Sequence, residues 1–438
     1  MNFSENAKTL VVEAGKLLQK KELVVRTWGN ISVRTDASNF FITPTGARYE
    51  VLEVEDVVQV SLDTLAWRGK KQPSSELLLH AKIYKYFPKV SFILHTHQQW
   101  GSLLTLLCYG KMGYVPVQSA WVNLFGTAFP SAEYAEAGTE QIAQSLLDAI
   151  VACYKKTECS ALCEFPLLRL EDRESGIALM AHHGIVVYAQ DMETAFALAQ
   201  RAEDYAKSFI LERLQILNIQ DNVFYNYDVT DAITPLDIFL KSASCSGNDN
   251  SESAISTKLR KVLYALQDFC FCDTAFSSCY ANSCGTKESS SIFFATCKES
   301  QVLSYLVNLK DWNKIGNVPP SCKADGKSRK GIGAYFDDVA QIAGSFFRIL
   351  NIEDLENDTI SNINLIFKEA SILIIEGEGL LLLAPSKEEA CNMIRLFEKN
   401  TYAFLLSLTD ENIAPLPLHN AKNLHEGYIT SYSKRAEQ

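Results

Sequence analysis

Two short histidine clusters constrain the fold of this chain more than any other feature. The chain has seven histidines in 438 residues, and four of them fall in His95-Thr96-His97 and His182-His183. The apolar run Phe92-Ile93-Leu94 before the first cluster predicts a strand, and residues two apart on a strand point to the same face. His95 and His97 would then project side by side. A third histidine from another strand end would give three nitrogen donors with one position left open, which is typical of a catalytic zinc site.

The composition indicates an ordinary globular protein, with 47% hydrophobic and 21% charged residues. A net charge of −11 argues against a nucleic acid or an anionic membrane as the main partner. The sequence shows neither a secretory leader pattern nor an apolar run of about 18 residues that would predict a transmembrane helix. We therefore expect a cytoplasmic protein that binds neither nucleic acid nor membrane.

Alternating helix and strand patterns predict a layered α/β domain in the first half of the chain. Apolar periodicity predicts helices over residues 4–21, 75–86 and 191–214, the last with Asp191 as its N-cap. Short apolar runs predict strands over residues 31–33, 40–42 and 57–60. The Ser-, Asn- and Gly-rich stretch 242–253 predicts a linker, which gives domains over residues 1–240 and 256–438 joined by residues 241–255.

The second half of the chain is predicted to be a degenerate copy of the first. The segment His183–Ala195 aligns without gaps on Glu378–Ala390, and the same spacing of 195 positions carries Glu203 onto Glu398. Glu378 stands in the position of His183, and the second half has no histidines other than His419 and His425. We therefore expect a domain of similar fold that lacks the metal ligands.

Several short blocks in the first half occur in a fixed order. They are Gly29–Arg34, Thr43–Gly46 with Tyr49-Glu50, Pro73–Glu76 with His80, His95–His97, Ala137–Thr139 and His182–Gly184. Taken together and in this order, the blocks resemble the class II aldolase/adducin family, and within it the fuculose-phosphate aldolases most closely, over roughly residues 5–215. The resemblance implies a three-layer α/β/α domain with a central mixed sheet, and either a homo-oligomer or internally paired domains.

The resemblance also implies a role for each matching residue. His95, His97 and His183 match the ligands of Zn²⁺ or another divalent metal, and Glu76 matches the acid/base carboxylate. The positions that match the phosphate-binding residues are Asn30, Thr45, Gly46, Ser74 and Ser75. The expected activity is a metal-dependent lyase that cleaves a phosphorylated, fuculose-phosphate-like ketose into dihydroxyacetone phosphate and an aldehyde.

Physical chemistry supports these roles. Cleavage of a carbon–carbon bond beside a carbonyl leaves an enediolate, whose negative charge a divalent metal can stabilise. A carboxylate such as that of Glu76 must then move a proton. Ser74 and Ser75, at a predicted helix start, offer hydroxyl and backbone N–H donors that suit a phosphate. Gly46 permits a close backbone approach to an anion in a turn, and Asn30 adds a side-chain donor.

Two alternatives remain open at the level of the sequence. The same metal site can serve a sugar-phosphate dehydratase, decarboxylase or epimerase, although the family's epimerases carry aspartate at the position of Glu76. The fold also occurs in an adducin-like interaction module without metal. Among single residues, we expect His80 and His182 to pack or to orient neighbours, and the pair Asp337-Asp338 to lie on a solvated face.

Overall fold

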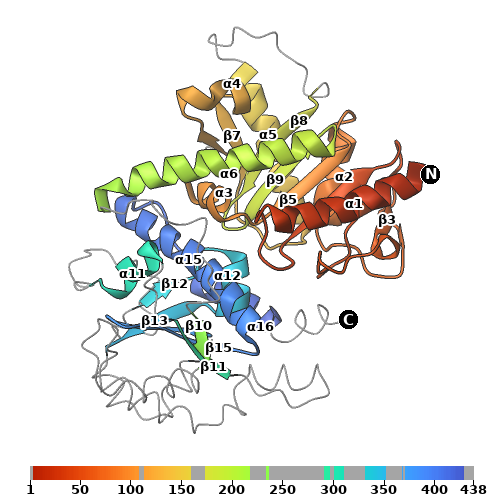
Figure 1. Ribbon diagram of the computed structural model, residues 1–438. Helices are drawn as coiled ribbons and strands as arrows, with labels where there is room; N and C mark the ends of the chain where they lie inside the picture. Colours follow the sequence, from red (N-terminus) through yellow and green to blue (C-terminus); the bar gives the residue numbers. More distant parts are fainter. Residues whose placement is uncertain are drawn as a thin grey trace. The chain divides into compact units, whose positions relative to one another are not determined.

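The computed structural model divides the chain into two compact units, Met1–Glu212 and Arg213–Gln438 (Figure 1). It describes residues 3–107, 113–158, 173–217, 233–235, 291–295, 300–309, 331–351, 367 and 370–428. The predicted linker, residues 241–255, lies outside the described residues, as do residues 159–172. Each unit is described by itself.

A nine-stranded mixed sheet forms the centre of the first unit, in the order β4-β3-β2-β1-β5-β9-β8-β7-β6. The β7–β8 pair is parallel, and the other neighbouring strands of this sheet are antiparallel. The central strands β5 and β9 are buried along their whole length. The strands are β1 (Gly29–Arg34), β2 (Asn39–Ile42), β3 (Val58–Ser61), β4 (Trp67–Arg68), β5 (Phe92–Thr96), β6 (Tyr114–Pro116), β7 (Ala128–Ala132), β8 (Ser175–Met180) and β9 (Gly184–Ala189).

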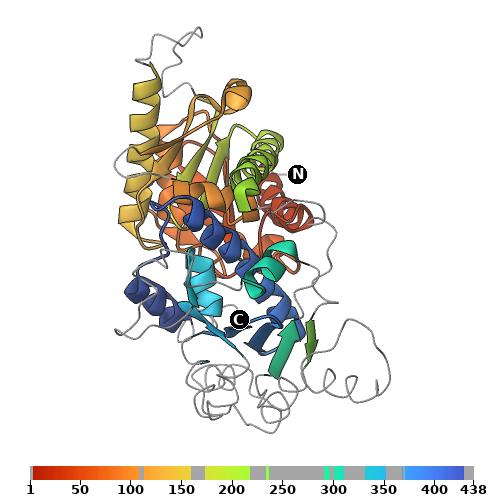
Figure 2. The ribbon, with the colours of Figure 1, turned by 90° about the vertical axis from the view of Figure 1, so that its left-hand side faces the viewer.

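Helices cover both faces of this sheet. In Figure 2 the helix α5 lies on one side of the strands, while α1 and α6 lie on the other. The first unit is therefore an α/β fold of three layers around a mixed sheet, as the sequence predicts. Its helices are α1 (Phe3–Lys20), α2 (Leu77–Tyr86), α3 (Gln99–Leu104), α4 (Val122–Phe125), α5 (Glu140–Glu158) and α6 (Met192–Leu214), with single 3₁₀ turns at Val54–Asp56, Thr105–Leu107, Ser119–Trp121 and Gln215–Leu217.

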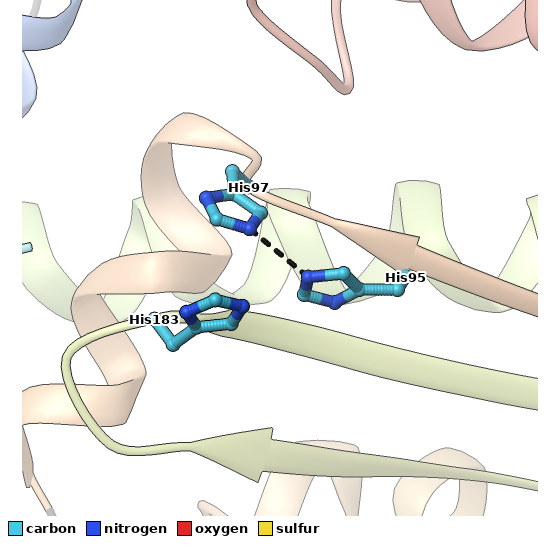
Figure 3. A group of neighbouring side chains, drawn as sticks. All are labelled: His95, His97 and His183. Carbon is cyan, nitrogen blue, oxygen red and sulfur yellow. Dashed lines mark hydrogen bonds between the residues drawn. The ribbon is translucent and has the colours of Figure 1, made fainter. Parts of the chain in front are cut away.

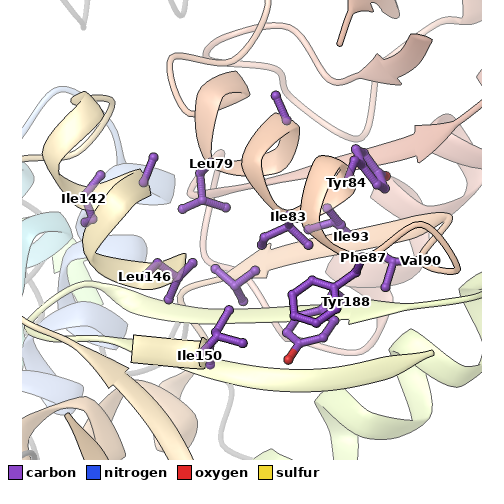
Figure 4. Packing of buried hydrophobic residues seen from close by; sticks show 14 of the residues in the cluster. Leu79, Ile83, Tyr84, Phe87, Val90, Ile93, Ile142, Leu146, Ile150 and Tyr188 are labelled. Atoms are coloured by element: carbon purple, nitrogen blue, oxygen red, sulfur yellow. The ribbon is translucent and has the colours of Figure 1, made fainter. Parts of the chain in front are cut away.

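The core under α2 and α5 fixes the part of the sheet that carries the histidines. Leu79 and Ile83 of α2 face Ile142 and Leu146 of α5 in one buried cluster (Figure 4). Farther along α2 the buried ring of Phe87 stacks on Tyr188 of β9, with ring centroids 5.1 Å apart. Burying such large side chains stabilises the fold by about 1.5–3 kcal/mol each. This packing fixes α2 and the residue that follows it in one core with α5, β5 and β9.

The helix boundaries follow from local chemistry that is legible in the sequence. The three predicted helices of the first unit form within a few residues of their expected ends. At α6 the carboxylate of Asp191 accepts the backbone N–H of Thr194 at 2.8 Å, which is the predicted N-cap contact. The helix α2 begins at Leu77 rather than at Ser75, because Ser74 and Ser75 form the turn that precedes it.

The second unit has a six-stranded mixed sheet in the order β10-β11-β15-β14-β13-β12. The β13–β14 pair is parallel and the other neighbouring pairs are antiparallel. The central strands β14 and β15 are fully buried. The elements are β10 (Ile233–Pro235), β11 (Ser291–Ala295), α11 (Gln301–Val307), β12 (Gly331–Gly333), α12 (Asp337–Ala343), β13 (Phe346–Leu350), β14 (Ile372–Ile375), β15 (Gly379–Ala384), α15 (Lys387–Thr409) and α16 (Leu418–Gly427).

The prediction of a solvated face at Asp337-Asp338 is wrong. Both side chains are buried in the first turn of α12. The ammonium of Lys399 on α15 lies 2.6 Å from the Asp338 carboxylate and is itself buried. The carboxylate of Asp338 also accepts the N–H of Val339 at 2.8 Å. The positive charge of Lys399, 61 positions later in the chain, offsets the cost of burying the Asp338 carboxylate.

No helix among the described residues is long and apolar enough to cross a membrane.

Candidate metal centre and active site

Three histidines meet where β5 ends and β9 begins. His95 lies within β5 and His97 just beyond it, so strand alternation turns both rings to the same face. β5 pairs antiparallel with β9, and this pairing brings His183, the residue before β9, to the same edge of the sheet. The hairpin between β8 and β9 holds His183 through its N–H, which donates to the carbonyl of Met180 at 3.0 Å.

The three rings face one another and are buried (Figure 3). Their ligand nitrogens all lie within 4.8 Å of one another. The Nε2 atoms of His95 and His97 are 2.9 Å apart, and the rings of His95 and His183 are stacked with centroids 5.0 Å apart. Among the described residues this is the group of histidine, cysteine and acidic side chains that can hold a metal ion. Three buried imidazole nitrogens with an open side fit a tetrahedral divalent ion.

The tautomer of His95 is fixed by a neighbouring carbonyl. Nδ1 of His95 lies 2.9 Å from the carbonyl oxygen of Ile185, to which it must donate its proton. Nε2 of His95 therefore carries a lone pair that points at the other two rings. Such a hydrogen bond on the far nitrogen is the usual way in which proteins orient a metal-binding histidine.

Gly184 permits the close approach of β9 to β5 at this point. A Cβ atom at Gly184 would lie 2.5 Å from the carbonyl oxygen of Thr96. It would also lie 3.1 Å from Cε1 of His95 and 3.2 Å from Cδ2 of His97. A glycine at this position is therefore required for the three rings to converge.

The carboxylate of Glu76 lies beside the three imidazoles. Glu76 is the N-cap of α2 and is 7% exposed. Its Oε1 is 3.2 Å from Nε2 of His183, and its Oε2 is 3.4 Å from Nε2 of His95. Burial alone would raise the pKa of Glu76, but the neighbouring imidazoles, His95 foremost, hold that pKa well below its usual range. The carboxylate is therefore in its ionised form.

Four of the predicted phosphate-binding residues lie on two adjoining turns. The turn at Thr45 and Gly46 is joined to the segment before α2 because the N–H of Thr45 donates to Gln72 and the N–H of Ser74 donates to Thr43. Gly46 adopts a φ of 64°, which glycine allows without strain. The hydroxyl oxygen of Ser74 accepts the N–H of Glu76 at 3.3 Å, while Ser75 is exposed. Their phosphate-binding role stays a prediction.

Asn30, the fifth predicted phosphate-binding residue, lies between two polar side chains and is buried. Its Nδ2 donates to Oε2 of Glu76 at 2.7 Å, and its Oδ1 lies 2.5 Å from Nε2 of His80. Both ends of the Asn30 amide therefore have protein partners. A phosphate contact for Asn30 stays a prediction. The prediction that His80 orients a neighbour agrees with its contact with Asn30.

The sequence reasoning missed Ser32 and Tyr84, which extend this polar group. The hydroxyl of Ser32 lies 2.6 Å from Nδ1 of His80 and 2.8 Å from the hydroxyl of Tyr84. A signal was available in the spacing, because Asn30 and Ser32 share one face of β1, and His80 and Tyr84 share one face of α2.

His182 does not join the ligand group. It occupies the hairpin turn with a φ of 60°, in the left-handed region, and its ring packs edge-on against Tyr134 with centroids 5.7 Å apart. This agrees with the structural role predicted for it.

Comparison with known proteins matches residues 9–210 to the family described as "Class II Aldolase and Adducin N-terminal domain". A 5-deoxy-D-ribulose 1-phosphate aldolase of Bacillus thuringiensis is 26% identical over 45% of this chain and 82% of its own length. An L-fuculose phosphate aldolase of Methanococcus vannielii is 27% identical over 44% of this chain and 88% of its own length. A probable L-ribulose-5-phosphate 4-epimerase of Mycoplasma pneumoniae is 39% identical over 22% of this chain and 40% of its own length.

The first unit of this chain therefore belongs to the class II aldolase and adducin family. The chain carries, within the matched residues, both the convergent histidines and the adjacent carboxylate described above.

Proposed function

We propose that the first unit is a metal-dependent lyase that cleaves a phosphorylated ketose into dihydroxyacetone phosphate and an aldehyde. The observation that carries this proposal is the convergence of three buried imidazoles on one point with a carboxylate 3.2 Å from the nearest of them. An interaction module would have no need to bury three histidines and an ionised glutamate together, because burial of such groups is costly unless they bind something.

His95, His97 and His183 would hold the metal ion, and Zn²⁺ is the first candidate because three nitrogen donors with an open position suit it. When bound, the ion would supply the electrophile that stabilises negative charge on the two oxygens of the ketose. Glu76 would accept and return the proton, because its carboxylate lies on the open side of the three rings and is held ionised. The turns at Thr45-Gly46 and Ser74-Ser75 would bind the phosphate. Asn30 would add only the second N–H of its amide, because its other N–H and its oxygen are held by Glu76 and His80.

A second candidate is a sugar-phosphate epimerase on the same metal site. It is favoured by the 39% identity of a 98-residue stretch to the probable epimerase of Mycoplasma pneumoniae. Against it stands the longer acid at Glu76, which reaches the imidazole nitrogens directly. A dehydratase or decarboxylase would use the same groups, and an adducin-like interaction module would use none of them.

An activity screen with the metal-replete protein distinguishes the lyase from the epimerase. The substrates are fuculose, rhamnulose and ribulose phosphates, and the product detected is dihydroxyacetone phosphate. The Glu76→Gln variant serves as the matched control, since it keeps the shape of the site and removes the base. Release of dihydroxyacetone phosphate by the parent protein but not by the variant supports the lyase. Conversion of a ribulose phosphate to its epimer without release of dihydroxyacetone phosphate would replace the lyase by the epimerase.

We further propose that the second unit is a degenerate copy of the first. Six strands of each sheet follow the same order with the same polarities: β1-β5-β9-β8-β7-β6 in the first and β10-β11-β15-β14-β13-β12 in the second. The single parallel pair, β7–β8, corresponds to the parallel pair β13–β14. β9 and α6 begin and end 195 positions before β15 and α15.

Details of the turns support the same proposal. A Cβ atom at Gly379 would lie 2.2 Å from the carbonyl oxygen of Ala295, which repeats the close approach of Gly184 to Thr96. Glu203 accepts the N–H groups of Trp100 and Gly101 at the start of α3.

The corresponding Glu398 accepts the hydroxyl of Ser300, the N-cap of α11. By the strand registers Phe294 stands where His95 stands, and Glu378 stands where His183 stands. The copy would therefore be catalytically silent. Because β10 already belongs to the sheet of the second unit, the boundary that we propose between the two domains lies before β10 and not at the predicted linker, residues 241–255. A homo-oligomer, or an internal pairing of the two domains, and a cytoplasmic location belong to this proposal as well.

A further inference from the structure

A chain of buried hydrogen bonds runs from α2 across β1 to the carboxylate of Glu76. The hydroxyls of Tyr84 and Ser32 are 2.8 Å apart, and that of Ser32 is 2.6 Å from Nδ1 of His80. Nε2 of His80 is 2.5 Å from Oδ1 of Asn30, whose Nδ2 is 2.7 Å from Oε2 of Glu76. All five side chains are buried, so water does not compete for these contacts.

The direction of each hydrogen bond follows from the chemistry at its ends. The amide nitrogen of Asn30 donates to Oε2 of Glu76, so the amide oxygen of Asn30 faces His80. Nε2 of His80 must then carry the proton that Asn30 accepts. Burial lowers the pKa of His80 to about 3, so the ring is neutral and its Nδ1 accepts from Ser32. The hydroxyl of Tyr84 completes the chain by donating to Ser32.

We propose that His80 is a positioning residue that, through Asn30, holds Oε2 of Glu76 as a permanent hydrogen-bond acceptor and leaves Oε1 as the oxygen that takes and returns the proton. This inference rests on the proposed function of Glu76 as the base. Oε1 faces Nε2 of His183 at 3.2 Å, and within the part of the chain that the structure describes no amide or hydroxyl group donates to it. The two oxygens of one carboxylate thus have different tasks.

Two substitutions of His80 test the contacts of its two ring nitrogens one at a time. Glutamine places its amide near the position of Nε2, so His80→Gln keeps a donor for Asn30. Asparagine places its amide near the position of Nδ1, so His80→Asn keeps the contact with Ser32 and loses the donor to Asn30. Both variants remove the imidazole and leave a polar amide in the same place, which makes each a control for the other.

We expect His80→Asn to lower kcat about 10–100-fold, which is the usual effect of losing a group that orients a reacting side chain. KM for the phosphorylated ketose and the amount of bound metal should stay within about twofold of the parent protein. His80→Gln should retain kcat within a few-fold. Equal losses in the two variants, or a change in KM alone, would overturn the positioning role while leaving the lyase proposal intact.

Nitrogen NMR of histidine-labelled parent protein tests the same inference without activity. We expect His80, assigned by its loss in His80→Gln, to show a protonated Nε2 and an unprotonated Nδ1 at neutral pH. The opposite tautomer would overturn the inference whatever the activity of the two variants. A parent protein that releases no dihydroxyacetone phosphate but shows the expected tautomer would refute the proposed function and not the direction of the hydrogen-bond chain.

Discussion

The close approach of Gly184 to β5 gives a quantitative link between a backbone contact and metal binding. In Gly184→Ala the new methyl carbon would lie 2.5 Å from the carbonyl oxygen of Thr96. An ordinary van der Waals contact for such a carbon is 3.4 Å or longer. The obstructing atom belongs to the backbone of a central strand, so no side chain can rotate away. About 1 Å of separation between β5 and β9 is needed, which we expect to destabilise the first unit by about 1–3 kcal/mol. The same shift displaces His95 and His97, so the metal should bind about 10–100-fold more weakly.

Gly379→Ala is the matched control for this prediction. Its methyl group would meet the carbonyl oxygen of Ala295 at 2.2 Å in the second unit, where no histidine stands beside it among the described residues. We expect a loss of stability in the second unit that is at least as large, because Gly379 also has a φ of 158°, and we expect unchanged metal affinity. Denaturant unfolding measures the stability, and competition with a chromophoric chelator measures the affinity. If Gly184→Ala binds the metal as tightly as the parent protein, or if Gly379→Ala loses as much metal affinity, the proposed link between this backbone contact and metal binding is wrong.

Three other predictions follow from charges in the two units. Burial lowers the pKa of His80 to about 3 in the folded protein, whereas in the unfolded chain this histidine takes up a proton below about pH 6.5. Stability is therefore lost as the pH falls, and His80→Gln should flatten the pH dependence of the free energy of unfolding between about pH 6 and 4 by ~1.4 kcal/mol per pH unit. An unchanged slope would contradict this expectation. Lys399→Met removes the ammonium that lies 2.6 Å from the buried Asp338 carboxylate and should cost about 3–5 kcal/mol in denaturant unfolding. The double replacement with Asp338→Leu should recover most of that loss. Glu76→Gln should lower kcat about 10²–10⁴-fold and keep the bound metal, and a variant with full activity would remove Glu76 from the mechanism.

Local patterns in the sequence account for much of the fold. The N-cap at Asp191 and the strand that carries His95 and His97 depend on neighbours within a few positions, and both form as predicted. Gly184 and Gly379, which lie 195 positions apart in the sequence, each allow a close contact with the carbonyl oxygen of a neighbouring strand in their own unit.

Contacts between distant segments could not be read in this way. The amide of Asn30 was predicted to bind phosphate, but its contacts with Glu76 and His80 depend on how α2 lies across β1. The burial of Asp338 likewise depends on Lys399 arriving from another helix. Residue type predicts which groups can react, whereas the register between elements decides which partner each group meets.

Metal analysis of the purified, metal-replete protein after gel filtration shows whether the three convergent histidines hold an ion. We expect about one divalent ion per chain in the parent protein and its loss when His95, His97 and His183 are replaced by alanine. The His419→Ala variant, altered outside the group, should keep the ion. Less than about a tenth of an equivalent of divalent metal in the parent protein would contradict a metal site at these histidines, and so would an ion that persists in the triple variant.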